Sequence, residues 1–76
     1  MKTGMLWFDN SCKPLEAKVA IGVQFYEQKY DKKPTTVCIN PATATAAGLK
    51  TPAKMDGVNV VSNQYVMLNH FWIGVE

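Results

Sequence analysis

The sequence predicts an α+β fold, a two-layer α/β sandwich in which one long helix lies on one face of a mixed four-stranded sheet. Residues 14–30 have the apolar spacing of a helix. Four short runs rich in β-branched and aromatic residues lie on either side of this segment, so the expected order is β-α-β-(α)-β-β. A chain of 76 residues is the length of a single domain, which we assign to residues 1–76.

The first half of the chain predicts a strand, a long helix and a second strand. Met5–Phe8 is a continuous apolar run that stops at Asp9, as expected for a buried strand. Pro14 suits the first turn of a helix, and the residue before Pro34 disfavours α conformation, so the helix should end there. Its predicted core face comprises Leu15, Val19, Gly22, Val23, Tyr26 and Tyr30. Residues 35–40 form the second strand, and a helical crossover makes the two strands parallel.

The second half of the chain predicts a short helix or single turn and two further strands. Asn40 is a suitable N-cap, Pro41 fits the first helical position, and Gly48 fits the position just beyond the helix. We expect residues 49–57 to form a loop. Residues 58–62 and 70–75 then form two strands, which we expect to pair with each other in antiparallel fashion.

Composition excludes several classes of protein. The chain is 47% hydrophobic and 18% charged, which is typical of a globular domain rather than a disordered one. No apolar run approaches the roughly 20 residues of a membrane span, and no signal peptide is expected in the opening MKTGMLWF. We therefore expect a cytoplasmic protein whose Cys12 and Cys38 are reduced. A net charge of +2 and the lack of arginine predict no nucleic-acid binding.

Several segments resemble known proteins. At LWFDN, KPTTVCINP and NHFWIGVE the chain resembles small bacterial proteins of similar length with no established function, and this resemblance implies no catalytic residue. The stretch KPTTVCINPATATAAGL, followed by GVNVVSNQYVMLNHFWIGV, is similar to part of the peripheral domain of tailed-phage major capsid proteins. That similarity implies a long helix packed on a small sheet. The chain differs in its much shorter length and in having a strand before the helix.

Polar residues follow both predicted parallel strands. Asp9, Asn10 and Ser11 come after the first strand, and Asn40 comes after the second. Ligands bind at the carboxyl ends of parallel strands in open α/β sheets, so these residues form a candidate small-ligand site. The alternative is that Asp9, Asn10 and Ser11 cap the long helix while Asn40 caps the short one.

A cysteine-based enzyme would have to use Cys12 and His70. Cys12 precedes the predicted long helix, whose N-terminus favours a thiolate, and His70 is the only histidine. No acid or oxyanion loop completes this pair, so we expect no enzymatic activity. His70 then hydrogen-bonds to a backbone carbonyl at the start of the last strand. One histidine with no ligand spacing around it predicts no metal site, and we expect no cofactor.

The sequence has more large apolar side chains than one small core accommodates. Ile21 and Phe25 fall outside the core face of the helix, and Trp7 and Trp72 are expected on the sheet face that the helix does not cover. These four residues are the predicted interface of a homodimer. The leading hypothesis is therefore a self-associating interaction module that binds a protein partner. A small-ligand pocket beneath the tryptophans is the alternative.

Overall fold

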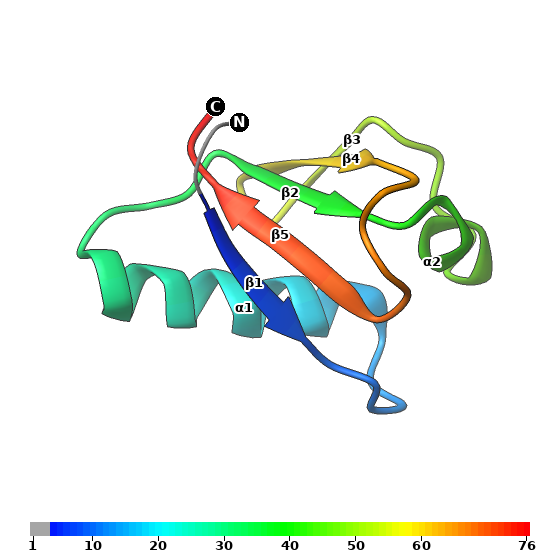
Figure 1. Ribbon diagram of the computed structural model, residues 1–76, viewed down its shortest axis with the longest axis horizontal. Helices are drawn as coiled ribbons and strands as arrows, with labels where there is room; N and C mark the ends of the chain where they lie inside the picture. The colour runs from blue at the N-terminus through cyan, green and yellow to red at the C-terminus, as the bar shows by residue number, and fades with distance from the viewer. Residues whose placement is uncertain (1–3) are drawn as a thin grey trace.

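The computed structural model describes residues 4–76. Residues 1–3, which open the segment in which we expected no signal peptide, lie outside the described residues. Two helices and a mixed five-stranded sheet make up the domain, and the strand order is β1-β5-β2-β4-β3. The elements are β1 (Gly4–Phe8), α1 (Leu15–Tyr30), β2 (Thr36–Ile39), α2 (Pro41–Ala46), β3 (Ala53–Met55), β4 (Val58–Ser62) and β5 (His70–Gly74). Figure 1 shows α1 along one face of the sheet and α2 beyond one end of it. The predicted α+β class, mixed sheet and long helix are confirmed. The predicted number of strands, four, is wrong, because the sheet has a fifth strand.

The additional strand, β3, lies in the segment that we expected to be a loop. It pairs with β4 in antiparallel fashion, with Met55 opposite Val58. Asp56 and Gly57 connect the two strands and have φ angles of 52° and 80°. Positive φ at both central residues defines a type I′ turn, whose twist matches that of a β-hairpin. The Asp-Gly pair therefore explains why this segment forms a hairpin.

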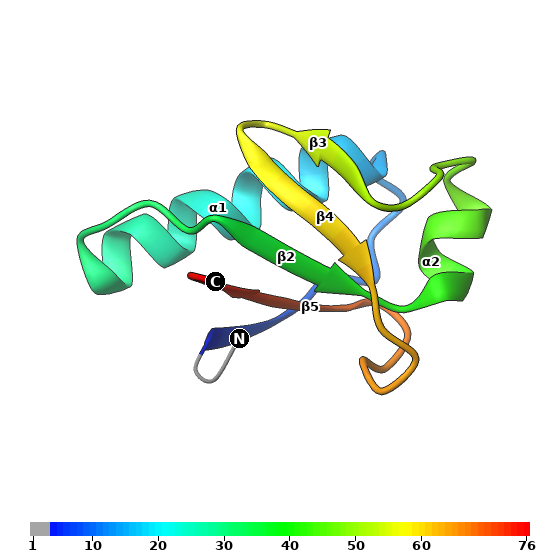
Figure 2. The ribbon, with the colours of Figure 1, turned by 90° about the horizontal axis from the view of Figure 1, so that it is seen from above.

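The position of β5 differs from the prediction. β1 and β2 run in the same direction, as expected, but β5 lies between them and is antiparallel to both. β4 and β5 do not pair with each other, because β2 separates them in the sheet. An interior position suits β5, since Phe71 and Ile73 are almost completely buried and apolar Trp72 faces the other side. Figure 2 shows the connection of residues 63–69 carrying the chain from β4 to β5.

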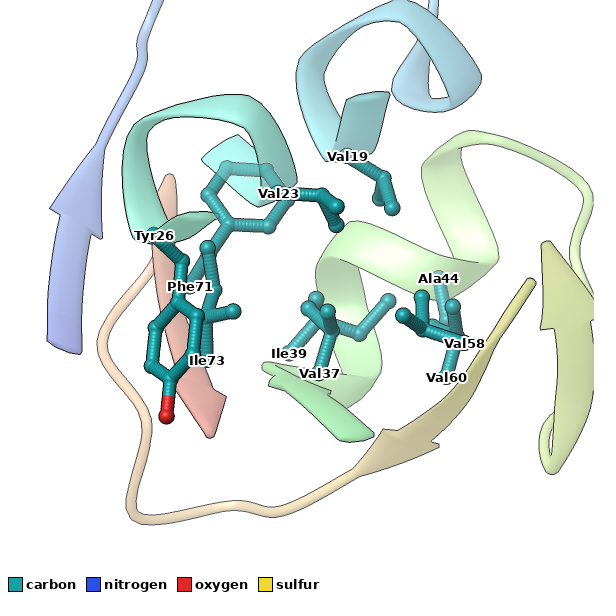
Figure 3. Close-up of a cluster of buried hydrophobic side chains, with 10 residues drawn as sticks. All are labelled: Val19, Val23, Tyr26, Val37, Ile39, Ala44, Val58, Val60, Phe71 and Ile73. Carbon is teal, nitrogen blue, oxygen red and sulfur yellow. The ribbon is translucent and has the colours of Figure 1, made fainter. Parts of the chain in front are cut away.

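The hydrophobic core lies between α1 and one face of the sheet. Pro14 is the N-cap of α1, so the helix begins one residue later than predicted, and Asp31 ends it in a left-handed conformation. The buried apolar side chains of the core are Val19, Val23, Tyr26, Val37, Ile39, Ala44, Val58, Val60, Phe71 and Ile73 (Figure 3). Tyr30 is an exception to the predicted core face, because it lies at the end of α1 and is 42% exposed.

The second helix begins as predicted. The Asn40 side chain caps α2 by accepting a hydrogen bond from the Ala42 backbone N–H at 2.8 Å, and Pro41 begins the helix. Gly48 follows with a φ of 68°, a conformation that glycine adopts without strain. Within residues 4–76, no helix has the length and apolar character needed to cross a membrane.

Candidate interaction surface

One face of the sheet carries apolar side chains and has no helix over it. Leu6 lies opposite Trp72, and Trp72 lies opposite Cys38 on its other side. Phe8 lies opposite His70, with ring centroids 4.9 Å apart. Leu6 and Phe8 are 58% and 53% exposed. We call this surface the uncovered face. Its apolar and aromatic part consists of Leu6, Phe8, Cys38, Val61, His70 and Trp72, and the polar Asn59 and Lys54 lie on the same face of β4 and β3.

The connection between β4 and β5 extends this apolar surface. Tyr65, Met67 and Leu68 are 84%, 69% and 57% exposed. An open hollow of about 360 Å³ lies where the connection meets the uncovered face, lined by Cys38, Val61, Asn63, Tyr65, Val66, Trp72 and Glu76. The connection is held in place because the Asn40 side-chain amide donates a hydrogen bond to the Val66 carbonyl at 2.8 Å. Burial, followed by the negative charge of Glu76, raises the pKa of the Cys38 thiol in this hollow.

Trp7 does not share a face with Trp72, which corrects our expectation. Trp7 lies opposite Phe71, and adjacent residues of a strand point to opposite faces, so Trp7 packs on the helix side. Its ring stacks on Phe25 of α1 with centroids 4.7 Å apart. Gly22 allows this approach, because a Cβ atom there would lie 3.1 Å from Cδ1 of Trp7. Phe25 nevertheless remains 47% exposed beside β1, and Ile21, one turn earlier, is half-buried.

Within residues 4–76, the outer edge of β1 pairs with no other strand. The Asp9 backbone N–H donates a hydrogen bond to the Asn69 carbonyl at 2.9 Å, which extends the β1–β5 register by one residue. Hydrogen-bonded and non-hydrogen-bonded pairs alternate along antiparallel strands. The N–H and C=O groups of Met5 and Trp7 therefore point toward β5, whereas those of Leu6 and Phe8 point outward. β1 is the terminal strand of the sheet, so no strand within residues 4–76 receives these outward groups.

Cys12 and His70 are not joined by a hydrogen bond. The Nδ1–H group of His70 donates to the Leu68 carbonyl at 2.9 Å, which confirms the expected backbone hydrogen bond at the start of β5. Cys12 is exposed in the turn between β1 and α1. No group of three or more potential metal ligands occurs among the residues that the structure describes.

The polar residues at the strand ends have separate local roles. The Asp9 carboxylate accepts a hydrogen bond from the Ser11 backbone N–H at 2.8 Å. Hydrogen bonds from the Ser11 side chain and backbone, with smaller contributions from Lys18 and Lys13, lower the pKa of Asp9. Because Pro14 is the N-cap of α1 and makes no side-chain cap, the expected capping of α1 by Asp9, Asn10 or Ser11 is wrong.

The two groups of predicted ligand residues form hydrogen bonds with different parts of the connection between β4 and β5. The Asp9 backbone bonds to Asn69, whereas the Asn40 side chain bonds to Val66. A groove of about 350 Å³ between the start of α1 and α2 is lined by Lys13, Pro14, Leu15, Lys18, Ala42, Thr43, Ala46, Ala47, Leu68 and Asn69. None of the four predicted ligand residues lines this groove. The sequence could not have predicted this groove, because it forms only where α2 packs at the same end of the domain as the start of α1.

Comparison of the chain with protein-family models, curated proteins and solved structures found no match. The function is therefore inferred from the geometry of the chain itself. Its most distinctive features are the apolar uncovered face and the free edge of β1.

Proposed function

We propose that the protein is a non-enzymatic, self-associating interaction module of the cytoplasm, which forms a homodimer and does not bind nucleic acid. The observation that carries this proposal is the exposure of Leu6, Phe8, Tyr65, Met67 and Leu68 on and beside the uncovered face. A sheet face that stays in water normally alternates polar residues with the buried ones. The part of the uncovered face on β1 and β5 instead carries the apolar side chains of Leu6, Phe8 and Trp72.

The free energy of burial favours a second copy on this surface. Complete burial of a large apolar side chain stabilises a protein by about 1.5–3 kcal/mol. Several such residues lie together here, and soluble monomers rarely expose large contiguous apolar patches. Association is a common way for a domain of this size to complete its core, because its own chain is too short to cover both faces.

Light scattering on matched variants tests this proposal. The double variant Leu6→Ser/Phe8→Ser removes two exposed apolar groups from the uncovered face and should shift the protein toward the monomer. Tyr30→Ser is the control, because Tyr30 is similarly exposed but lies at the end of α1. The proposal fails if the wild-type protein is a monomer, or if both variants change association equally.

A small-ligand protein is the second candidate function. The groove between the start of α1 and α2 has an apolar floor that includes Leu15 and Leu68, and Lys13 and Lys18 also line it. Two lysines beside an apolar floor suit a small organic anion. NMR titration with a panel of aromatic and aliphatic carboxylates tests this candidate. Saturable shifts in the groove that disappear in Lys13→Gln/Lys18→Gln would support it, and an absence of shifts would contradict it.

A further inference from the structure

We infer that the second copy docks on the free edge of β1, so that the two β1 strands pair in antiparallel fashion and join both sheets into one. This inference rests on the proposed self-association and specifies its geometry. The outward N–H and C=O groups of Leu6 and Phe8 are the hydrogen-bonding groups involved. An unpaired strand edge is a template for another strand, because each of its backbone groups needs a partner.

The two edges of the sheet differ in how well they resist such pairing. β3, at the far edge, has only three residues, includes Lys54 and directly follows Pro52. Short length, charged side chains and proline all discourage edge pairing in natural proteins. β1 has five residues, Gly4–Phe8, with no charged residue, proline or bulge among them. The edge open to association is therefore the edge of β1.

Side-chain sizes along β1 are complementary to a second β1 in two-fold pairing. If Leu6 of one copy lies opposite Leu6 of the other, then Gly4 of each copy lies opposite Phe8 of the other. Gly4 has no side chain, and Nε1 of Trp72 lies 3.0 Å from the position of its missing Cβ. Because the Trp72 indole already fills the space over Gly4, the Phe8 ring of one copy would lie against this indole of the other, an aromatic contact that favours a second copy over an unrelated strand.

Exposed apolar side chains lie on both sides of the same edge. Leu6 and Phe8 are on the uncovered face, while Phe25 stacks on Trp7 on the helix side and remains 47% exposed. Pairing along β1 places all of these side chains next to the seam between the copies. Face-to-face packing of two uncovered faces would leave Phe25 in water. The exposure of Phe25 together with Leu6 and Phe8 thus favours pairing at the edge.

Amide hydrogen exchange, followed by NMR at low and high protein concentration, tests the inference. Exchange at the Leu6 and Phe8 amides should slow as concentration rises, because these N–H groups enter hydrogen bonds only in the pair. The Met5 and Trp7 amides point toward β5 and are the internal controls. Leu6→Pro removes one outward N–H without removing a β1–β5 hydrogen bond, since an edge strand tolerates proline at such a position. It should reduce association at least tenfold.

The possible outcomes distinguish a failure of edge docking from a failure of the proposed self-association. A protein that remains monomeric would overturn both. A dimer whose Leu6 and Phe8 amides exchange at rates independent of concentration would overturn the edge mode and leave self-association standing. Should Leu6→Pro fail to give the wild-type circular dichroism spectrum, Leu6→Lys replaces it, because a lysine on the edge opposes pairing while keeping the backbone N–H. Undiminished association of a folded variant would also overturn the edge mode.

Discussion

The two faces of the sheet are built from the same strands but differ in what covers them. On the helix side, Phe71 is 1% exposed and Ile73 is fully buried. On the other side of the same strand, His70 and Trp72 are only half-buried, and Leu6 next to Trp72 is 58% exposed. Apolar side chains thus occur on both faces, although the chain covers only one. The apolar content of these strands therefore exceeds what the covered face alone requires, and we propose that a second copy covers the remainder.

The sharpest test of this comparison uses neighbouring residues of β5. Phe71→Ala should cost about 3–5 kcal/mol of unfolding free energy, because it removes a ring from the closed core and leaves a cavity. Trp72→Ala should cost distinctly less in the monomer and should weaken association instead. Chemical denaturation at low protein concentration separates the two effects. Equal losses of stability would contradict the assignment of the two faces.

The contact between α1 and the covered face can be tested at Gly22. A Cβ atom there would lie 2.7 Å from Cδ1 of Ile73, so Gly22→Ala should destabilise the protein by about 1–3 kcal/mol through overpacking. The better helix propensity of alanine, about 1 kcal/mol, offsets part of this cost. Ile73→Val removes the clashing methyl group, so the double variant should be more stable than the sum of the single effects predicts. Strict additivity in thermal unfolding would argue against the contact.

A smaller effect is expected at Trp7, whose buried indole N–H has no hydrogen-bond partner within residues 4–76. An unsatisfied buried donor costs about 1–3 kcal/mol, so Trp7→Phe removes a penalty as well as packing. We expect its stability to lie within about 1 kcal/mol of the wild type, whereas Trp7→Ala should lose about 3 kcal/mol because the stack on Phe25 disappears. Urea denaturation measures both. A large loss in Trp7→Phe would mean that the N–H group has a stabilising contact.

The smallest effect concerns pH and the turn after β1. The lowered pKa of Asp9 means that its charged form favours the folded state. This contribution is present above the pKa of the unfolded chain and is lost as the pH falls through the folded pKa. Ser11→Ala should raise the Asp9 pKa toward its ordinary value, because the Ser11 side chain is the main cause of the shift. Carboxyl chemical shifts across an acid titration measure this, and an unchanged pKa in Ser11→Ala would contradict it.

Local sequence signals predicted the elements better than their arrangement. The apolar spacing of residues 14–30 predicted α1, and Asn40-Pro41 predicted the start of α2. The β3–β4 hairpin was missed although Asp56-Gly57 signals a type I′ turn, because the three residues of β3, Ala53–Met55, are too few to show the alternating pattern of a strand. The insertion of β5 between β1 and β2 depends on contacts between distant segments, which no local pattern specifies.

For the same reason, the sequence predicted only part of the candidate interaction surface. Phe25 and Trp72 were correctly expected outside the closed core, because helical spacing and strand alternation are local properties. Trp7 was assigned to the wrong face, since the face of one strand relative to another depends on register, and register is set by pairing. The free edge of β1 and the exposed Tyr65 and Met67 became evident only with the strand order and the path of the connection.

We propose that a second copy completes the surface beside β1 and the uncovered face. Sedimentation equilibrium of the unmodified protein, from low to high micromolar concentration, tests it most directly. We predict an average mass that rises with concentration from 8.4 kDa toward twice that value, and that returns toward 8.4 kDa in Leu6→Lys. A mass of 8.4 kDa at every concentration would contradict the account.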